Sequence, residues 1–308
     1  MAFATRRTAG DWTRLSGLVA IWGTAFLFID IAVDSLPPAT LVAMRVLVAA
    51  LVLVLLAPVL GLRLPPPGRL WLRFLLLACV GNAIPFFSIS WGQTRVASGT
   101  TGLLMAVMPL ATLVLAHFFV ADERLSRNEP RKVLGFLLGF SGVLLLTGPE
   151  ALDRLEGGTS DIGHQLAILL GALCYAVNTI LARRMPPMHP IVSAACTMIM
   201  ASAVMVPASL LLDAPWRLTP EPSSLLSALW LGLVPTGAAT VLYFRIVSSA
   251  GPTFLSLMNY GIPVVALCAG AAVLGEPVGG SLLAALGLVL GGLFLSQTAS
   301  SRAPGLRA

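Results

Sequence analysis

The sequence predicts an all-α membrane protein with ten transmembrane helices, built as two inverted five-helix repeats around a central cavity, with both termini in the cytoplasm. Composition, charge distribution and an internal repeat support this prediction. Of the 308 residues, 57% are hydrophobic and 10% are charged, and the mean hydropathy is +0.92. A soluble domain needs a more polar surface than this composition provides.

Apolar runs long enough to cross a bilayer recur along the chain. A helix needs roughly 20 apolar residues to span the hydrocarbon core, whereas a membrane β-barrel would show segments of about ten alternating residues. The first run follows Arg6 and Arg7, is too long for the core of a signal peptide and precedes no cleavage motif, so we expect it to be the first helix. We predict helices over 15–34, 39–61, 70–92, 99–121, 133–148, 164–183, 190–212, 224–247, 252–274 and 279–297.

The charged residues indicate the orientation of these helices. With the N-terminus in the cytoplasm, most of the 19 basic residues fall on the cytoplasmic side, and the acidic residues fall mostly on the other. This asymmetry is the positive-inside rule. The formal charge of +6 therefore reflects topology in a bacterial inner membrane and does not indicate a nucleic-acid partner. The four cysteines lie in apolar runs without metal-ligand spacing, so we expect neither a metal nor another cofactor.

The chain aligns with itself at an offset of about 152 residues. Five helices per copy is an odd number, so the second copy must enter the membrane from the opposite face. We predict a first repeat over 1–148, an external linker over 149–163 and a second repeat over 164–308. The aligned pairs include Pro85 with Pro235, Pro109 with Pro263, Glu123 with Glu276, and Gly135 and Gly139 with Gly287 and Gly291.

Several local motifs resemble the drug/metabolite transporter superfamily, in its ten-helix EamA-type branch. They are Trp22-Gly23, Pro37-Pro38 with Arg45 downstream, and the endings ADERLS and LGEPVG, each followed by a G-x-x-x-G helix. The length and layout are similar to those of the YddG-like amino-acid exporters. The resemblance implies a secondary carrier that exports small neutral solutes, including aromatic amino acids, by alternating access. Hydrophobic cations, drugs and other metabolites are the alternative solutes.

Four prolines inside predicted helices mark a candidate cavity. A proline leaves the carbonyl four residues earlier without its helical hydrogen bond, which is tolerated only where protein or water replaces that bond. Their pairing by the repeat favours bent helices around a central solute site over ordinary packing kinks. The prolines are Pro85, Pro109, Pro235 and Pro263, and the released carbonyls would be those of Gly81, Met105, Leu231 and Asn259.

Aromatic, thioether and amide side chains occur at the depth of these prolines. Apolar walls with few amides suit a neutral, partly apolar ligand. Taken singly, each methionine or aromatic residue is better explained by ordinary packing, whereas an unpaired asparagine is unfavourable in lipid. The candidate substrate-binding residues are Trp22, Phe26, Asn82, Phe86, Met105, Met108, Tyr175, Asn178, Asn259 and Tyr260.

Asp30 and Arg45 are charged residues well inside predicted helices, on either side of the turn at 35–38. One interpretation is a structural ion pair that lets Arg45 reach outward. The other is that Asp30 binds a proton and couples export to proton entry. The G-x-x-x-G motifs allow close helix packing within one chain or between two, so a monomer and a homodimer are equally compatible with the sequence.

Two other classes of membrane protein are disfavoured. The sequence has no H-E-x-x-H motif, Gly-x-Ser-x-Gly elbow or Walker loop, so nothing indicates an embedded enzyme. A channel needs a continuous polar lining, and these helices carry few polar residues. The predicted partners are a small-molecule substrate and the lipid bilayer.

Overall fold

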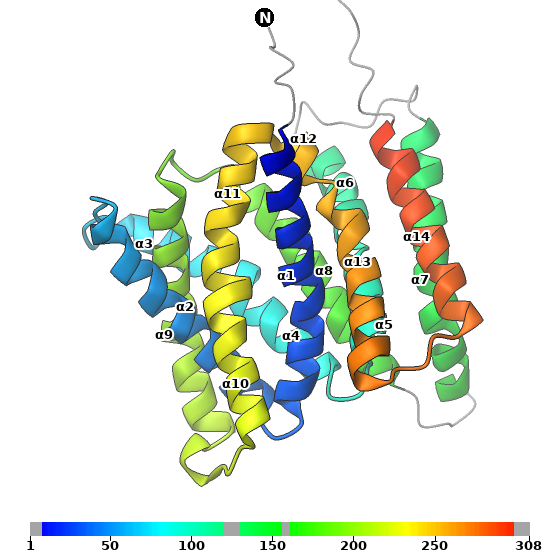
Figure 1. Ribbon diagram of the computed structural model, residues 1–308, viewed down its shortest axis with the longest axis horizontal. Helices are drawn as coiled ribbons and strands as arrows, with labels where there is room; N and C mark the ends of the chain where they lie inside the picture. The colour runs from blue at the N-terminus through cyan, green and yellow to red at the C-terminus, as the bar shows by residue number, and fades with distance from the viewer. Residues whose placement is uncertain (1–7, 120–129, 156–160, 299–308) are drawn as a thin grey trace, which may run out of the picture.

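The computed structural model describes residues 8–119, 130–155 and 161–298, and every regular element in them is a helix (Figure 1). Seven helical segments in this part of the chain are long and apolar enough to cross a membrane, and three shorter apolar helices accompany them. Helical structure therefore covers the apolar runs predicted from the sequence wherever the chain is described.

Most of the membrane-length segments are continuous, but several are divided by irregular turns or π-helical stretches. The first half contains α1 (Ala9–Val33), α2 (Pro38–Val59), α3 (Arg69–Ala78), η1 (Cys79–Ala83), α4 (Ile84–Gly92), α5 (Ser98–Met105), α6 (Met108–Phe119) and α7 (Pro130–Leu155). The second half contains α8 (Ile162–Ala182), α9 (Pro190–Leu212), η3 (Pro215–Arg217), α10 (Pro222–Leu231), η4 (Gly232–Ala238), α11 (Ala239–Ala250), α12 (Pro252–Leu255), α13 (Met258–Ala269), η5 (Gly270–Leu274) and α14 (Gly280–Thr298).

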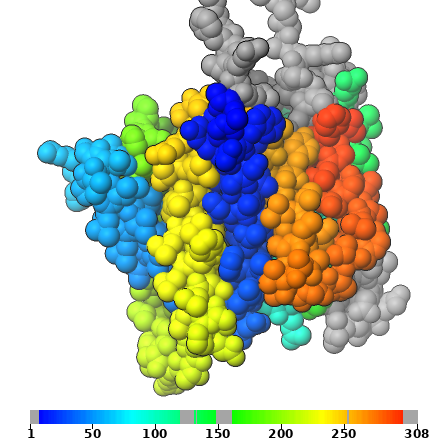
Figure 2. Space-filling view, in the orientation of Figure 1, coloured from blue at the N-terminus to red at the C-terminus, as the bar shows by residue number. Residues whose placement is uncertain are grey.

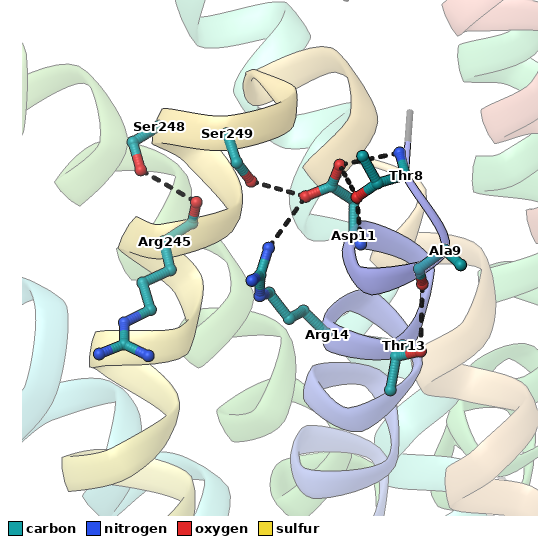
Figure 3. A network of polar contacts seen from close by, with 8 residues as sticks. All are labelled: Thr8, Ala9, Asp11, Thr13, Arg14, Arg245, Ser248 and Ser249. Carbon is teal, nitrogen blue, oxygen red and sulfur yellow. Dashed lines mark hydrogen bonds and ion pairs between the residues drawn. The ribbon is translucent and has the colours of Figure 1, made fainter. Parts of the chain in front are cut away.

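Helix α1 begins six residues before its predicted start, because Thr8 and Asp11 form a capping box. Such a box satisfies backbone N–H groups of the first turn that have no helical acceptor. The Asp11 carboxylate accepts from the Thr8 hydroxyl at 2.8 Å, from the Ser249 hydroxyl at 2.8 Å and from Arg14 Nη1 at 3.1 Å (Figure 3). The start of α1 is thereby fastened to the last turn of α11.

The helices that contain Pro85 and Pro235 both include a π-helical segment at the proline. At η1 the Ile84 N–H donates to the carbonyl of Cys79, and at η4 the Ala239 N–H donates to that of Val234, in each case five residues back. A π-helical turn widens the backbone and is frequent at functional sites.

The helices that contain Pro109 and Pro263 are broken rather than widened. The chain leaves helical geometry at 106–107, just before α6, and at 256–257, just before α13. Pro109 lies in the first turn of α6, where a missing N–H is tolerated. Pro263 lies inside a continuous α13, and the interruption at 256–257 ends six residues upstream of it.

The two halves are interleaved. Helix α2 packs against α9, α7 packs against α14, and α5 packs against α13. Helix α1 packs against α13, α10 and α11, and α8 packs against α4, α6 and α5. In Figure 1 the α7–α14 pair forms one side of the molecule and α2, α3 and α9 form the opposite side.

Large apolar side chains are exposed on the outer helices, and a surface of this kind is compatible with lipid and not with water. On α2 and α9 they include Leu51, Leu55, Val59, Leu210 and Leu211, and on α7 they include Leu134, Leu137 and Leu144.

Glu276 links the second half to the start of α5. Gly275 has a φ of 68°, a conformation that favours glycine, and it turns the chain after η5. The Glu276 carboxylate then accepts the backbone N–H groups of Ser98 at 2.6 Å and Gly99 at 2.9 Å. A carboxylate at this position is favoured by the positive end of the α5 dipole. Its predicted repeat mate, Glu123, lies outside the described residues.

Small residues bring α7 and α14 together within one chain, as the G-x-x-x-G motif on α7 allows. A Cβ atom added to Gly135 would lie 2.5 Å from the Gly292 carbonyl oxygen, and one added to Gly292 would lie 2.5 Å from the Gly139 nitrogen. The second motif was misassigned, because Gly287 has open space around it and Gly291 meets only Leu138. Gly292 makes the close contact because it lies on the helix face directed at α7.

We predict that Gly292→Leu separates α7 from α14 and destabilises the protein by about 1–3 kcal/mol, as overpacking does elsewhere. Gly287→Leu is the matched control, since a side chain there enters open space. The apparent melting temperature in detergent, measured by fluorescence-detected size exclusion, should fall for the first variant only. Equal losses in the two variants would contradict the assigned contact.

Candidate substrate site

Arg45 lies at the centre of the helix assembly, where α2 passes the π-helical segment η4. Its Nε donates to the Thr236 hydroxyl at 2.8 Å. The guanidinium carbon lies 3.8 Å from the centroid of the Phe86 ring on α4, in a cation–π contact. Only 7% of the residue is accessible. Two neutral groups from two other helices therefore hold a buried cation in place.

Thr236 also supplies a hydrogen bond to a backbone carbonyl that Pro235 leaves without its helical donor. Its hydroxyl donates to the Leu231 carbonyl oxygen at 2.8 Å, and this is one of the carbonyls that the prolines were predicted to release. A hydroxyl has a single proton. Because Thr236 gives this proton to Leu231, its oxygen is left to accept from Arg45.

Trp22 brings α1 to the same point. Its indole Nε1 donates to the Pro235 carbonyl oxygen at 2.9 Å. The indole ring also lies 5.9 Å from the ring of Tyr243 on α11. Helices α1 and α2 thus both bind the interrupted middle of the segment that contains Pro235.

Phe86, Tyr175 and Asn178 extend the site toward α8. The rings of Phe86 and Tyr175 meet edge to face at 6.4 Å. Asn178 lies against Gly81 in η1, so closely that a Cβ at Gly81 would come within 2.7 Å of the amide. The Asn178 Oδ1 is buried and has no hydrogen-bond partner in the described structure. An unsatisfied amide beside a π-helical segment is a polar group that a bound solute could engage.

The other predicted residues are less closely connected to Arg45. Phe26 is buried, and its carbonyl accepts from Gln93 Nε2 at 2.9 Å. Met105 and Tyr260 pack against one apolar cluster formed with α14. No contact observed in the described residues joins the side chains of Asn82, Met108 and Asn259 to the Arg45 group.

The predicted ion pair between Asp30 and Arg45 was wrong, since no such pair forms among the described residues. Helices α1 and α2 follow each other in sequence, but α10 packs against both of them and η4 lies between Arg45 and α1. Asp30 instead lies near Gln93, Asp34 and Glu276. Sequence adjacency did not place these two charges side by side.

Sequence reasoning missed Thr236 and Gln93. Thr236 directly follows a predicted helix-interrupting proline, and a hydroxyl at that position is suited to take the carbonyl that the proline releases. Gln93 had no comparable signal, because its role depends on the approach of α1.

The model of the EamA-like transporter family matches residues 15–148 and 163–298. The chain belongs to this family. It is therefore a membrane transporter by family, which agrees with its apolar helices and with the resemblance seen in its motifs.

Relatives of this EamA-like transporter are similar over nearly their whole lengths. The inner membrane transporter YedA of Escherichia coli K12 is 26% identical over 279 residues, covering 90% of this chain and 87% of its own. A probable terminal-alkyne amino-acid exporter of Streptantibioticus cattleyicolor is 25% identical over 297 residues, covering 94% and 96%. One crystal structure covers 96% of this chain and 100% of its own at a TM-score of 0.64 and 20% identity, which shows the shared fold.

We predict that Thr236→Val destabilises the transporter by about 1–3 kcal/mol, because the Leu231 carbonyl and Arg45 Nε both lose a buried partner. Thr240→Val is the matched control, since its hydroxyl bonds only the carbonyl one turn back, at 2.6 Å. Urea-induced unfolding followed by tryptophan fluorescence should separate the two. Equal destabilisation would show that the Thr236 hydroxyl has no special role.

Proposed function

We propose that this EamA-like transporter is a secondary carrier of the bacterial inner membrane that exports small neutral solutes, chiefly amino acids including aromatic ones, by alternating access. The observation that carries the proposal is the composition of the central site. A buried guanidinium lies against the Phe86 ring, Phe86 contacts Tyr175 on α8, and α8 also carries Asn178, whose buried amide oxygen has no partner in the described structure. Charged and apolar groups side by side match a zwitterion with an apolar side chain. The amino-acid exporter among its relatives supports this solute class.

The mechanism rests on the proposed arrangement of ten membrane helices as two inverted repeats with both termini cytoplasmic. Two observed helix pairs join equivalent elements of the two halves, α2 with α9 and α7 with α14, and α5 packs against α13, which belongs to the segment equivalent to its own. Helix α1 packs on the interrupted segments of the second half, as α8 packs on those of the first. Inverted repeats of this kind can rock about a midplane site and open it to each side in turn.

Hydrophobic cations are the second class of solute within this fold. They are disfavoured because the central charge is positive and Asp30 faces a different group of residues, among them Gln93. A membrane-embedded enzyme and a channel are disfavoured by the sequence, as described above.

Purified transporter in proteoliposomes should exchange labelled phenylalanine or leucine for the same unlabelled amino acid, with a rate that saturates. The test is a counterflow assay with amino acids, purines and cationic dyes, and empty liposomes as the control. Acceptance of a dye while every amino acid fails would overturn the proposed solute class. Flux proportional to concentration without saturation would indicate a channel.

We further propose that Asp30 carries the coupling proton. The observation that favours this is the absence of a cationic partner for Asp30 among the described residues, where its electrostatic neighbours are Asp34 and Glu276. Carboxyl groups inside membrane helices commonly serve as proton carriers in transporters.

Asp30→Asn should retain counterflow, which needs no net proton movement, but lose the stimulation of net transport by a pH gradient. Glu221→Gln is the matched control, because Glu221 is exposed and is not among the neighbours of Asp30. Net flux of a labelled amino acid is measured with and without an imposed gradient. Stimulation of Asp30→Asn equal to that of the unmodified protein would rule the coupling role out.

A further inference from the structure

A groove runs between α2 and the segment formed by η4 and α11. Its volume is about 350 Å³, and its lining is apolar apart from one arginine at one end. The lining residues are Val52 and Leu56 from α2, and Gly237, Ala238, Val241, Leu242 and Arg245 from η4 and α11. Figure 2 shows α11 in yellow on the surface, beside α1 in dark blue and near the lighter blue of α2 and α3.

One end of this groove lies near Thr236, the hydrogen-bond partner of Arg45. Gly237 directly follows Thr236, which accepts the Arg45 hydrogen bond. Val52 lies seven residues after Arg45 on α2, and two helical turns place them on one helix face. Close packing of Gly232 against Val48 and the Arg45 carbonyl holds α2 and η4 together at this end. The groove therefore stops at this packing, and Arg45, which is not among its lining residues, lies on the other side of it.

The Arg45 guanidinium has N–H donors that are not used in hydrogen bonds to the described residues. A guanidinium carries five N–H groups, and the one on Nε is bonded to Thr236. In the part of the chain that the structure describes, the four on the terminal nitrogens have no hydrogen-bond partner and no carboxylate forms an ion pair with them. A buried cation without a counter-charge is strongly unfavourable in a membrane protein. The cation–π contact with Phe86 replaces only part of the lost hydration.

We propose that Arg45 is the binding residue for the carboxylate of the transported solute. The planar pair of terminal nitrogens matches a carboxylate in a bidentate fashion, which a lysine cannot reproduce. Phe86 and Tyr175 supply an apolar surface beside it for the solute side chain. The inference rests on the proposed transport of amino acids and narrows the solute class. The solute needs a free carboxylate and an apolar group, and its amino group contributes less to recognition.

Ligand chemistry tests this in the unmodified protein. Equilibrium binding of labelled phenylalanine is challenged with 3-phenylpropionate, phenylalanine amide, 2-phenylethylamine and inorganic phosphate. We expect 3-phenylpropionate to compete, and the amide and the amine to be at least about 30-fold weaker, as the loss of a buried charge partner implies. Amide or amine competing as well as the free acid would overturn the proposal. Phosphate competing as strongly as 3-phenylpropionate would also overturn it, since the site would then recognise only negative charge.

Variants at Arg45 test the same contact from the protein side. Arg45→Gln should weaken phenylalanine binding at least about 30-fold and should bind phenylalanine and phenylalanine amide equally. Arg45→Lys should keep part of the preference for phenylalanine over its amide. Arg95→Gln is the matched control, because it removes an exposed arginine outside the site. Unchanged preference for the acid in a folded Arg45→Gln would overturn the assignment. If Arg45→Gln does not fold, Arg45→Lys and the comparison of ligands still decide.

A second labelled probe separates this inference from the proposed function. Binding of labelled 3-phenylpropionate that depends on Arg45, with no binding of any amino acid, would support the carboxylate site and refute amino-acid transport. Binding of amino acids that does not change in the Arg45 variants would support amino-acid transport and refute the carboxylate site at Arg45.

Discussion

The hydrogen bond from Arg45 to Thr236 connects the parts of this transporter that matter for its site. It joins α2 to the interrupted middle of the 222–250 helix, and the same interruption accepts a hydrogen bond from Trp22 on α1. The arginine is held over Phe86, which brings α4 into the group. Two helices from the first half thus bind one irregular turn of the second half, and α4 joins them through the Arg45 side chain. Burying the Arg45 cation costs free energy, because each neutral contact replaces only some of the lost hydration.

Interrupted helices are the reason that polar chemistry exists at this depth. A regular helix uses all of its backbone groups internally and offers lipid or solute nothing but side chains. The π-helical segments at Pro85 and Pro235, and the breaks before α6 and α13, release or redirect such groups inside the protein. At Pro235 the structure shows how they are used, since the Leu231 and Pro235 carbonyls accept from Thr236 and Trp22. The interruption at Pro235 therefore weakens its helix but provides the carbonyl groups that bind Thr236 and Trp22.

Much of the fold was predictable because lipid imposes a simple rule on sequence, namely long apolar runs. The prolines also predicted which helices depart from regularity, although Pro263 lies six residues beyond the break in its own segment. Contacts between distant segments were harder to predict. The predicted Asp30–Arg45 pair was wrong because α10 and η4 come between the two side chains. The contact of α14 with α7 is made by Gly292 instead of Gly287 and Gly291, because a G-x-x-x-G spacing does not by itself say which face of a helix meets its partner. The early start of α1 was missed, although Thr8 and Asp11 have the spacing of a capping box.

The partners of α1 have a consequence for how the chain is made. This helix precedes the other described helices in the chain, yet it packs against α10, α11 and α13, and the Asp11 carboxylate accepts a hydrogen bond from Ser249. Until those segments are synthesised, α1 must wait in the bilayer with Asp30 inside it and its main contact surface facing lipid. The packing of α1 is therefore unfinished until α13 has been synthesised. Early truncations should expose this helix to membrane proteases, whereas two halves made as separate chains could still complete each other.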